Sequence, residues 1–205
     1  MPKVAYSEED RERIRQALIA EGLRHMARQG VQHTTVEQIC KAVGISRAFF
    51  YSFFPTKEDL MVEALYLQQP KILAHAQALA NDPALSRSEA LRRFLTDCCY
   101  GEKNGIAVLT VEEQRLIFRR LSEESARVFR EKQARLFGEL LECFGIPANR
   151  ERVALFTNVS LAAMIVHRAI PDTLPLFVPE AADQTVAFQI NAIVEGFEKF
   201  QKTNG

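Results

Sequence analysis

The residues whose types and spacing could do chemistry are concentrated between Lys41 and Lys57. This stretch contains three basic residues, Lys41, Arg47 and Lys57, and no acidic residue. Ammonium and guanidinium groups bind phosphate oxygens, and a guanidinium can also bind the O6 and N7 atoms of one guanine. Because the whole chain is neutral, with 26 basic and 26 acidic residues, a general positive field cannot attract nucleic acid. The pattern therefore indicates a local phosphate-binding surface.

Motifs for other kinds of chemistry are missing from the sequence. It contains no H-E-x-x-H zinc motif, no Gly-Lys-Ser/Thr phosphate loop and no Gly-x-Ser-x-Gly nucleophile motif. The four cysteines have no C-x-x-C spacing, which argues against a zinc site and against a disulfide framework. We therefore expect a protein that is not an enzyme, with no catalytic residue, no bound metal and no cofactor.

The elements that must position the basic residues are helices. Apolar residues recur at i, i+3 and i+4 along most of the chain, while sustained period-two alternation is nearly absent. This periodicity predicts an all-α protein of about nine helices. Capping and breaking residues bound the first three helices: Ser7, Gly30, Thr34 or Thr35, Gly44 and Ser46. The later helices are expected at residues 57–80, 86–100, 106–120, 122–144, 148–169 and 180–202.

Residues 34–53 have the pattern of a helix-turn-helix. Two short capped helices flank Gly44, which allows the tight turn, and the second helix can enter the major groove of DNA. Apolar residues fall where the two helices must pack on each other, namely Ile39, Val43, Ile45 and Phe50. The other residues of the second helix and its flank lie on outer faces: Arg47, Ala48, Phe49, Tyr51, Ser52 and Phe53.

The helix-turn-helix resembles the DNA-binding domain of the TetR family of bacterial transcriptional regulators. The resemblance covers about residues 8–66 and follows the family pattern without a gap, from Thr34-Thr35-Val36 through Val43-Gly44-Ile45-Ser46 to Phe54-Pro55-Thr56-Lys57-Glu58. It implies two domains: a three-helix DNA-binding domain at residues 1–60, and a larger helical effector-binding and dimerisation domain at residues 61–205.

The resemblance also implies roles for single residues. Phosphate contacts are expected from Thr35, Tyr51 and Lys57, and the side turned toward base edges carries Arg47, Ala48, Phe49 and Ser52, with Phe53 on its flank. Arg47 is the best candidate for reading a base, because its guanidinium can bind guanine bidentately. Phe49 stands where the family often has a small hydroxyl residue. Its ring can contact a thymine methyl group or fold back onto Phe53, and both alternatives stay open.

In the resembled family the C-terminal domain encloses a pocket for a small-molecule effector. Candidate lining residues combine aromatic bulk with a few polar groups, and they are His75, Phe94, Cys98, Phe118, Phe129, Phe156, Met164 and His167. For each residue taken singly, an ordinary core position is the more common explanation of such an aromatic stripe at helical spacing. The two histidines could pair across the pocket, or each could bind a backbone carbonyl. Adjacent Cys98 and Cys99 raise the further hypothesis of thiol sensing, although neighbours on a helix point about 100° apart.

The last two helices are expected to pair with those of a second copy. The first carries a stripe of apolar and small residues at Phe156, Ser160, Ala163 or Met164, and His167. The second is apolar on more than one side, through Val186, Phe188, Ile190, Ile193, Val194, Phe197 and Phe200, and Gly196 would permit close approach. A homodimer would place two recognition helices on the two halves of a palindromic operator.

We thus expect a ligand-responsive transcriptional regulator. It would be a repressor that binds double-stranded operator DNA and leaves it when a small molecule binds. The alternative is an activator, or a regulator controlled by a partner protein, and an enclosed apolar cavity would distinguish the two. No apolar run approaches the roughly 20 residues that cross a bilayer, so no membrane contact is expected. The N-terminus turns charged where a signal peptide would be apolar, which predicts a cytoplasmic protein.

Overall fold

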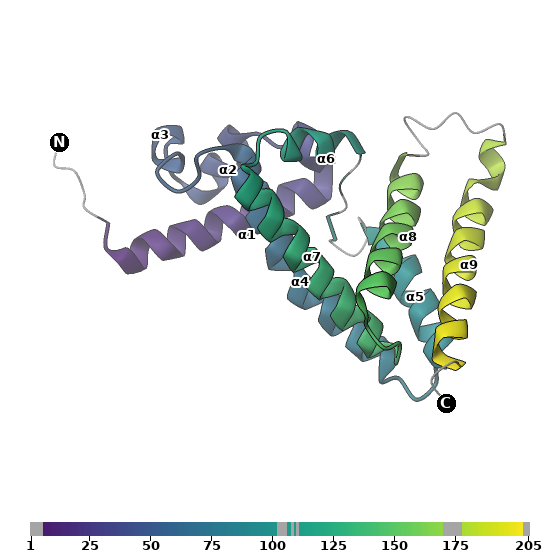
Figure 1. The fold of residues 1–205 in the computed structure, drawn as a ribbon. Coiled ribbons are helices and arrows are strands. Elements are labelled where there is room, and N and C mark those ends of the chain that lie inside the picture. Colours follow the sequence, from purple (N-terminus) through teal and green to yellow (C-terminus); the bar gives the residue numbers. More distant parts are fainter. Residues whose placement is uncertain (1–5, 102–105, 108, 110, 170–177, 203–205) are drawn as a thin grey trace, which may run out of the picture.

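The computed structural model describes residues 6–101, 106–107, 109, 111–169 and 178–202. These residues form nine α-helices and no strand, which confirms the predicted all-α fold (Figure 1). The helices are α1 (Glu8–His33), α2 (Val36–Val43), α3 (Arg47–Phe50), α4 (Lys57–Ala80), α5 (Arg87–Cys99), α6 (Val111–Phe118), α7 (Glu123–Cys143), α8 (Arg150–Ala169) and α9 (Ala182–Lys202). A 3-10 turn at Pro179–Ala181 precedes α9.

Hydroxyl groups cap the N-termini of the first helices. The side-chain oxygens of Ser7, Thr35 and Ser46 accept hydrogen bonds from amides in the first turns of α1, α2 and α3, at 3.0, 3.2 and 3.1 Å. Of the two threonines considered for α2, Thr35 is therefore the cap. The hydroxyl of buried Thr34 instead donates to the carbonyl oxygen of Gly30, at 2.7 Å. The three bonds to Ser7, Thr35 and Ser46 satisfy amides that have no partner inside their own helix.

Two glycines allow the turns around α2. Gly30 has φ 76° and breaks α1 at the predicted place, after which one more turn runs to His33. Gly44 has φ 79° and ends α2 in the left-handed region, as expected for a helix C-terminus. Residues with a β-carbon rarely adopt this conformation, so the helix-turn-helix depends on glycine here.

The helix expected at residues 106–120 is shorter in the structure, where α6 spans only Val111–Phe118. Residues 106, 107 and 109 lie outside any helix, and 108 and 110 are outside the described residues. The side-chain amide of Gln68 in α4 explains the difference. It donates to the carbonyl oxygen of Ala107 and accepts from its amide nitrogen, each at 2.9 Å. A backbone that a distant side chain satisfies needs no helical partner, so the tertiary contact overrides the local pattern.

Buried apolar side chains form two clusters that meet along α4. Its first half, with Leu60 and Met61, packs with α1, α2 and α3, and the same cluster includes Ile117 of α6 and Phe129 of α7. Its second half, with Ala76, packs with α5, α7, α8 and α9. α4 therefore runs from one cluster into the other (Figure 1). The division of the chain at residue 60 stays a prediction.

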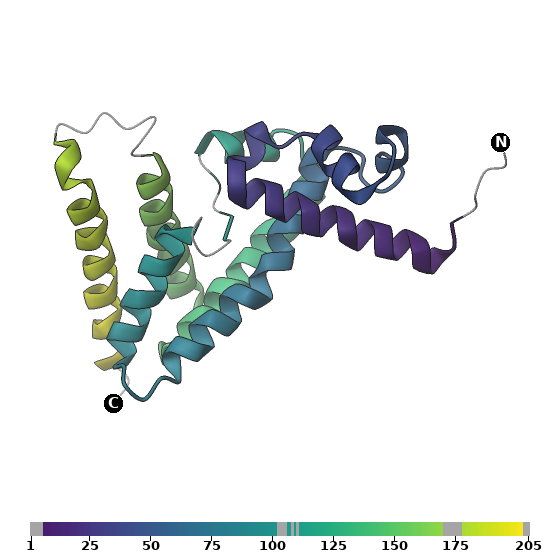
Figure 2. The same ribbon diagram turned by 180° about the vertical axis from the view of Figure 1, so that it is seen from behind.

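Helices α8 and α9 lie side by side at the opposite end of the molecule from α3 (Figure 2). α7 and α8 run in opposite directions and form a hairpin that α4 and α5 cover. Within the described part of the chain, no helix is both long and apolar enough to cross a bilayer.

Candidate functional site

The helix-turn-helix presents a small outer surface around α3. Ile39 and Phe50 are fully buried between α2 and α3, and Cys40 is buried beside them, so the inner faces pack as predicted. Arg47, Ala48, Tyr51 and Ser52 are exposed, whereas Phe49 and Phe53 are half-buried. The outer surface therefore carries one guanidinium, two hydroxyls and a methyl group, which can all contact the major groove of DNA.

Arg47 makes an ion pair with Glu37 of α2, with 2.7 Å between Nη1 and Oε1. Both side chains are 62% exposed. An exposed pair of this kind contributes only about 0–1 kcal/mol, because water screens the charges and two long side chains must be ordered. A base or a phosphate can therefore replace Glu37 as the partner of Arg47 at little cost.

Phe49 folds back into an aromatic cluster in the described structure. Its ring meets that of Phe53 edge to face at 5.0 Å and stacks on that of Tyr6 at 4.8 Å. The guanidinium of Arg11 lies 4.7 Å from the centre of the Phe53 ring and donates to the carbonyl oxygen of Ser52 at 3.3 Å. Sequence reasoning missed Tyr6 and Arg11, because about 40 residues separate them from α3. A thymine contact by Phe49 would require this cluster to open.

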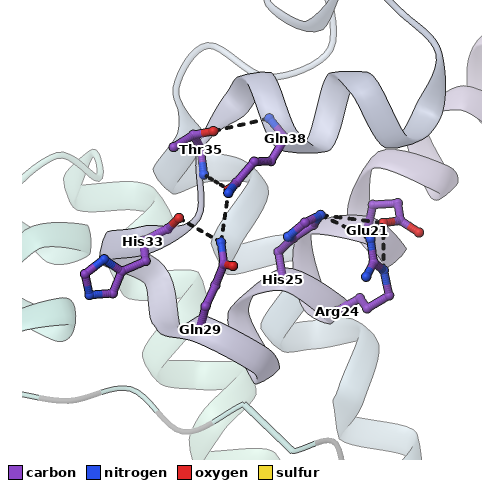
Figure 3. Close-up of polar contacts among 7 residues, drawn as sticks. All are labelled: Glu21, Arg24, His25, Gln29, His33, Thr35 and Gln38. Carbon is purple, nitrogen blue, oxygen red and sulfur yellow. Dashed lines mark hydrogen bonds and ion pairs between the residues drawn. The ribbon is translucent and has the colours of Figure 1, made fainter.

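Thr35 is held in place by a chain of side-chain hydrogen bonds (Figure 3). Gln38 accepts from the Thr35 amide at 2.9 Å, and Gln29 donates both to Gln38 at 3.0 Å and to the carbonyl oxygen of His33 at 2.7 Å. The Thr35 hydroxyl oxygen already accepts from the Gln38 amide, so its own hydrogen is free to be donated. The exposed hydroxyl is thus suited to a phosphate oxygen.

Figure 3 also shows His25 beside Arg24 and Glu21, one turn of α1 before Gln29. Burial lowers the pKa of His25, and the positive charge of Arg24 lowers it further. The imidazole is therefore neutral at neutral pH.

Lys57 begins α4 and reaches the broken end of α1. Its ammonium donates to the carbonyl oxygens of Val31 and Thr34, each at 3.0 Å. An ammonium has three donors, so one remains for a phosphate oxygen after these two bonds are made. The expected phosphate contact stays a prediction, and the structure adds a second role that the sequence did not indicate. Lys57 joins α4 to the end of α1.

A cavity of about 910 Å³, partly open to solvent, lies between α4, α5, α6, α7 and α8. Six of the eight candidate effector residues line it: Phe94, Cys98, Phe118, Phe129, Phe156 and Met164. Its walls are mostly apolar, and its size is within the range of about 300–1,000 Å³ that is usual for small-molecule sites. The residues that sequence reasoning missed include Gln68, Gln114, Arg130 and Ser160.

The two histidines do not line this cavity, which corrects the expectation for them. His75 forms an ion pair with Asp97 of α5, with 2.9 Å between Nε2 and Oδ2. His167 packs edge to face on the ring of Tyr100, with 4.2 Å between ring centres. The partner of each imidazole lies in α5 or directly after it, and the sequence alone could not place α5 beside these histidines. Among the described residues, the two histidines neither pair with each other nor bind a backbone carbonyl.

The segment around α6 connects the cavity to the helix-turn-helix. Gln114 and Phe118 line the cavity, while Glu113, which directly precedes Gln114, is buried and accepts from the backbone amide of Val31 in α1. After α6, Arg120 donates to the carboxylate of Glu58 in the first turn of α4, at 3.0 Å. One short segment thus contacts the cavity, the end of α1 and the start of α4.

The apolar stripes of α8 and α9 mostly face the interior of the subunit. On α8, Phe156, Ser160, Ala163 and Met164 are buried in the chain's own core, which corrects the prediction that this stripe faces a second copy. On α9, Val186, Ile190, Ile193, Val194 and Phe197 are buried as well, against α5 and α8. The large apolar side chains that these two helices expose are Leu155, at 45%, and Phe188, at 74%. A dimer through these helices stays a prediction.

Comparison with known proteins agrees with this arrangement. A family model described as "Bacterial regulatory proteins, tetR family" matches residues 18–64. The HTH-type transcriptional regulator TcmR of Streptomyces glaucescens is 32% identical over 96 residues, which are 46% of this chain and 42% of that protein. The chain thus aligns with less than half the length of this curated relative.

Solved structures share the whole fold. A TetR-family transcriptional regulator from Pectobacterium atrosepticum is similar with a TM-score of 0.59 and 16% identity, over 94% of this chain and 97% of that one. SCO4454, a TetR-family regulator from Streptomyces coelicolor, gives a TM-score of 0.55 at 16% identity over the same shares. The N-terminal match lies on the helix-turn-helix, and the likeness in fold extends over the C-terminal helices. Residues 18–64 thus match the TetR family of bacterial regulatory proteins, and the described helices share the fold of solved structures from that family.

Proposed function

We propose that this protein is a ligand-responsive transcriptional repressor that binds a palindromic operator as a homodimer and releases it when a small molecule fills the cavity. One observation carries the proposal. Described residues between Ala107 and Arg120 form part of the cavity wall, and others in the same stretch hydrogen-bond to α1 and α4 beside the helix-turn-helix. A ligand in the cavity therefore contacts the same segment that contacts the DNA-binding unit.

The exposed groups around α3 support DNA binding. Arg47 is placed to read a base, while Thr35 and Lys57 each keep one donor for a phosphate. Because α3 is only four residues long, a single copy can read few base pairs. Two copies related by a two-fold axis would read half-sites about one helical turn apart, or a multiple of it.

Exposed groups on α8 and α9 support a homodimer. Leu155 and Phe188 present apolar surface to solvent, and a β-carbon added at Gly196 would meet open space. A second copy can therefore approach α9 closely at this glycine. The two helices lie side by side, so a two-fold axis beside them would form a four-helix bundle (Figure 2).

Ligand response would act through a shift between two arrangements of the N-terminal unit. A ligand that fits better when the two recognition helices are splayed lowers operator affinity by its differential affinity, typically about 1–3 kcal/mol. α4 carries the change, because Lys57 and Glu58 lie beside the helix-turn-helix and Ile72 lines the cavity. The α6 segment is a second connection between the same two places.

The cavity bears on the alternative of a regulator controlled by a partner protein. A filled core would favour such a partner, because no space would remain for a small molecule. The space of about 910 Å³ favours a ligand instead. Activation is separated from repression by a reporter gene placed behind the operator, whose expression falls when a repressor is added and rises with an activator.

The first experiment is selection of bound duplexes from a random library at near-physiological salt, where nonspecific attraction is weak. We expect a palindromic site to be enriched. The Arg47→Ala protein is the matched control, and its enriched site should lose preference at one position of each half. Enrichment of no sequence, with folded protein, would refute the proposal.

A further inference from the structure

The cavity has a charge pattern that limits which ligands it can hold. Of its described lining residues, the ones with formally charged side chains are Arg130 of α7 and Arg150 of α8, and none is an aspartate or a glutamate. Cys98 also lines the cavity, but burial raises the pKa of its thiol, so the thiol is neutral at neutral pH. The wall is therefore positive at its edge and apolar inside.

Neither arginine has a carboxylate partner among the described residues. Arg127, on the same helix as Arg130, is different: it pairs with Glu124 and Glu131, each at 2.6 Å. Arg135 pairs with Glu139 at 3.0 Å. The arginines of α7 that face away from the cavity are thus neutralised, whereas the one at the cavity is available to an anion.

Ser160 gives the cavity an unsatisfied polar group in its interior. This residue of α8 is only 1% exposed and lines the cavity, and its hydroxyl has no hydrogen-bond partner. Buried hydroxyls are nearly always hydrogen-bonded, because the loss of water must be compensated. A donor or acceptor on a bound molecule would satisfy this hydroxyl.

The positions of these groups indicate the shape of the ligand. Ser160 follows Arg150 by ten residues, which is about 15 Å along α8. The wall between them is apolar and contains Phe137 and Phe156. A ligand that uses both ends would have an extended apolar body with an anionic group at one end and a hydrogen-bonding group away from it.

We propose that the effector of this cavity is an apolar acid, with its anionic group at Arg150 and a hydroxyl or carbonyl group at Ser160. This inference rests on the proposed function only in calling the ligand an effector. The binding chemistry itself depends on the cavity alone, so it can be tested without DNA.

The test measures displacement of the uncharged fluorescent probe N-phenyl-1-naphthylamine from the full chain. Three competitors with twelve carbons are compared below their aggregation limits: dodecanoate, dodecanol and 12-hydroxydodecanoate. We expect the Arg130→Gln, Arg150→Gln double variant to bind dodecanoate about tenfold more weakly, while dodecanol changes less than about twofold. Arg127→Gln is the matched control, because it removes a charge from α7 outside the cavity, and it should change neither. The two single variants show whether Arg150 holds the anion.

Ser160→Ala tests the polar end separately. We expect this variant to bind 12-hydroxydodecanoate about threefold to tenfold more weakly and dodecanoate as before, since only the former can bond to the hydroxyl. Thermal unfolding checks that each variant is folded.

Two outcomes would overturn the acid proposal, and a third would refute only the regulatory role. If dodecanoate and dodecanol bind equally well and neither responds to the arginine changes, the cavity takes neutral ligands, and ligand control of DNA binding survives. If the probe and all competitors fail to bind folded protein, the acid proposal and the ligand part of the proposed function both fail. Binding of acids without any change in operator affinity would leave the cavity chemistry standing and refute only the regulatory role.

Discussion

The carboxylate of Glu113 accepts a hydrogen bond from the backbone amide of Val31, across 82 residues of sequence. Val31 directly follows the break in α1 at Gly30, and both Val31 and Glu113 are buried. A side chain beside the cavity-lining residue Gln114 therefore satisfies a backbone amide next to the helix-turn-helix. The bond between Arg120 and Glu58 is a second polar contact between the same two regions.

Replacement of Glu113 by Ala should destabilise the protein and weaken this connection. The Val31 amide would be left buried without an acceptor, so we expect the free energy of unfolding to fall by about 1–3 kcal/mol. Glu113→Gln keeps an acceptor oxygen and should lose less. Urea denaturation measures both, and equal stability of the alanine variant and the parent would show that the bond stabilises nothing.

Arg47→Ala should relax base preference more than it weakens binding. Loss of a bidentate contact removes about 1–3 kcal/mol of discrimination at one base pair. Glu37→Gln is the control, since it only frees Arg47 from an exposed ion pair, and operator affinity should stay the same or rise slightly. Binding to operators with single base changes is the measurement. An unchanged preference at every position would remove Arg47 as a base reader.

Lys57→Met should show both roles of this ammonium. Methionine keeps an apolar stem but donates to neither Val31 nor Thr34, so the free energy of unfolding should drop by about 1–3 kcal/mol. If the third donor binds a phosphate, the slope of log affinity against log salt should also fall by about one. A lower stability with an unchanged salt slope would leave Lys57 as a joint between α1 and α4 without a DNA contact.

Gly44→Ala should destabilise the helix-turn-helix through the backbone alone. A β-carbon at this position would meet no atom within 4 Å, but φ is 79°. The left-handed conformation costs a residue with a β-carbon about 1–2 kcal/mol. Gly44→Asn should lose less, because asparagine tolerates this region better. Thermal unfolding compares the three proteins, and an alanine variant as stable as the parent would contradict the argument.

Cys98 and Cys99 should be unreactive in the folded protein. Burial raises the pKa of Cys99 to about 11 and raises that of Cys98 as well, so both thiols are protonated at neutral pH. We expect Ellman's reagent to modify half-buried Cys143 first and the adjacent pair only as fast as the protein unfolds. Replacement of both by Ser should leave any oxidant response of DNA binding intact. Prompt modification of the pair would revive thiol sensing.

The same raised pKa values set a pH dependence. In the unfolded chain these thiols ionise near pH 8.5, but in the folded chain they stay protonated to higher pH. Their contribution to stability is therefore fully present at neutral pH and is lost as the pH rises from about 8.5 through the folded pKa. Urea denaturation between pH 8 and 11 should show a decline that is smaller when both cysteines are replaced.

Local signals in the sequence are sufficient to predict where most of the helices begin and end. Ser7 and Ser46 cap the predicted helices, Thr35 is the one of two candidate threonines that caps α2, and Gly44 ends α2, because these interactions join residues within one or two turns. The helix at 106–120 was overextended for the opposite reason. The bonds between Ala107 and Gln68 span 39 residues, and no local pattern reveals them.

The candidate site shows the same division. Aromatic residues at helical spacing indicated much of the cavity wall, because bulky apolar side chains face the interior wherever the helices pack. Polar partners on other helices could not be predicted from the sequence. His75 pairs with Asp97 and does not line the cavity, whereas Ser160, which the sequence places at a helix interface with a second copy, does line it. The apolarity of α9 was explained by a second copy, although α5 and α8 of the same chain cover most of it.

The paired hydrogen bonds between Gln68 and Ala107 have a consequence for how the protein would behave in a cell. They belong to a wall shared by the cavity and the DNA-binding unit, and any free energy that links two binding events acts equally in both directions. If a ligand weakens operator binding by some factor, operator DNA weakens ligand binding by that same factor. Extra copies of the operator would then desensitise the whole population of regulators, so the dose of ligand needed for release would rise with the number of sites in the genome.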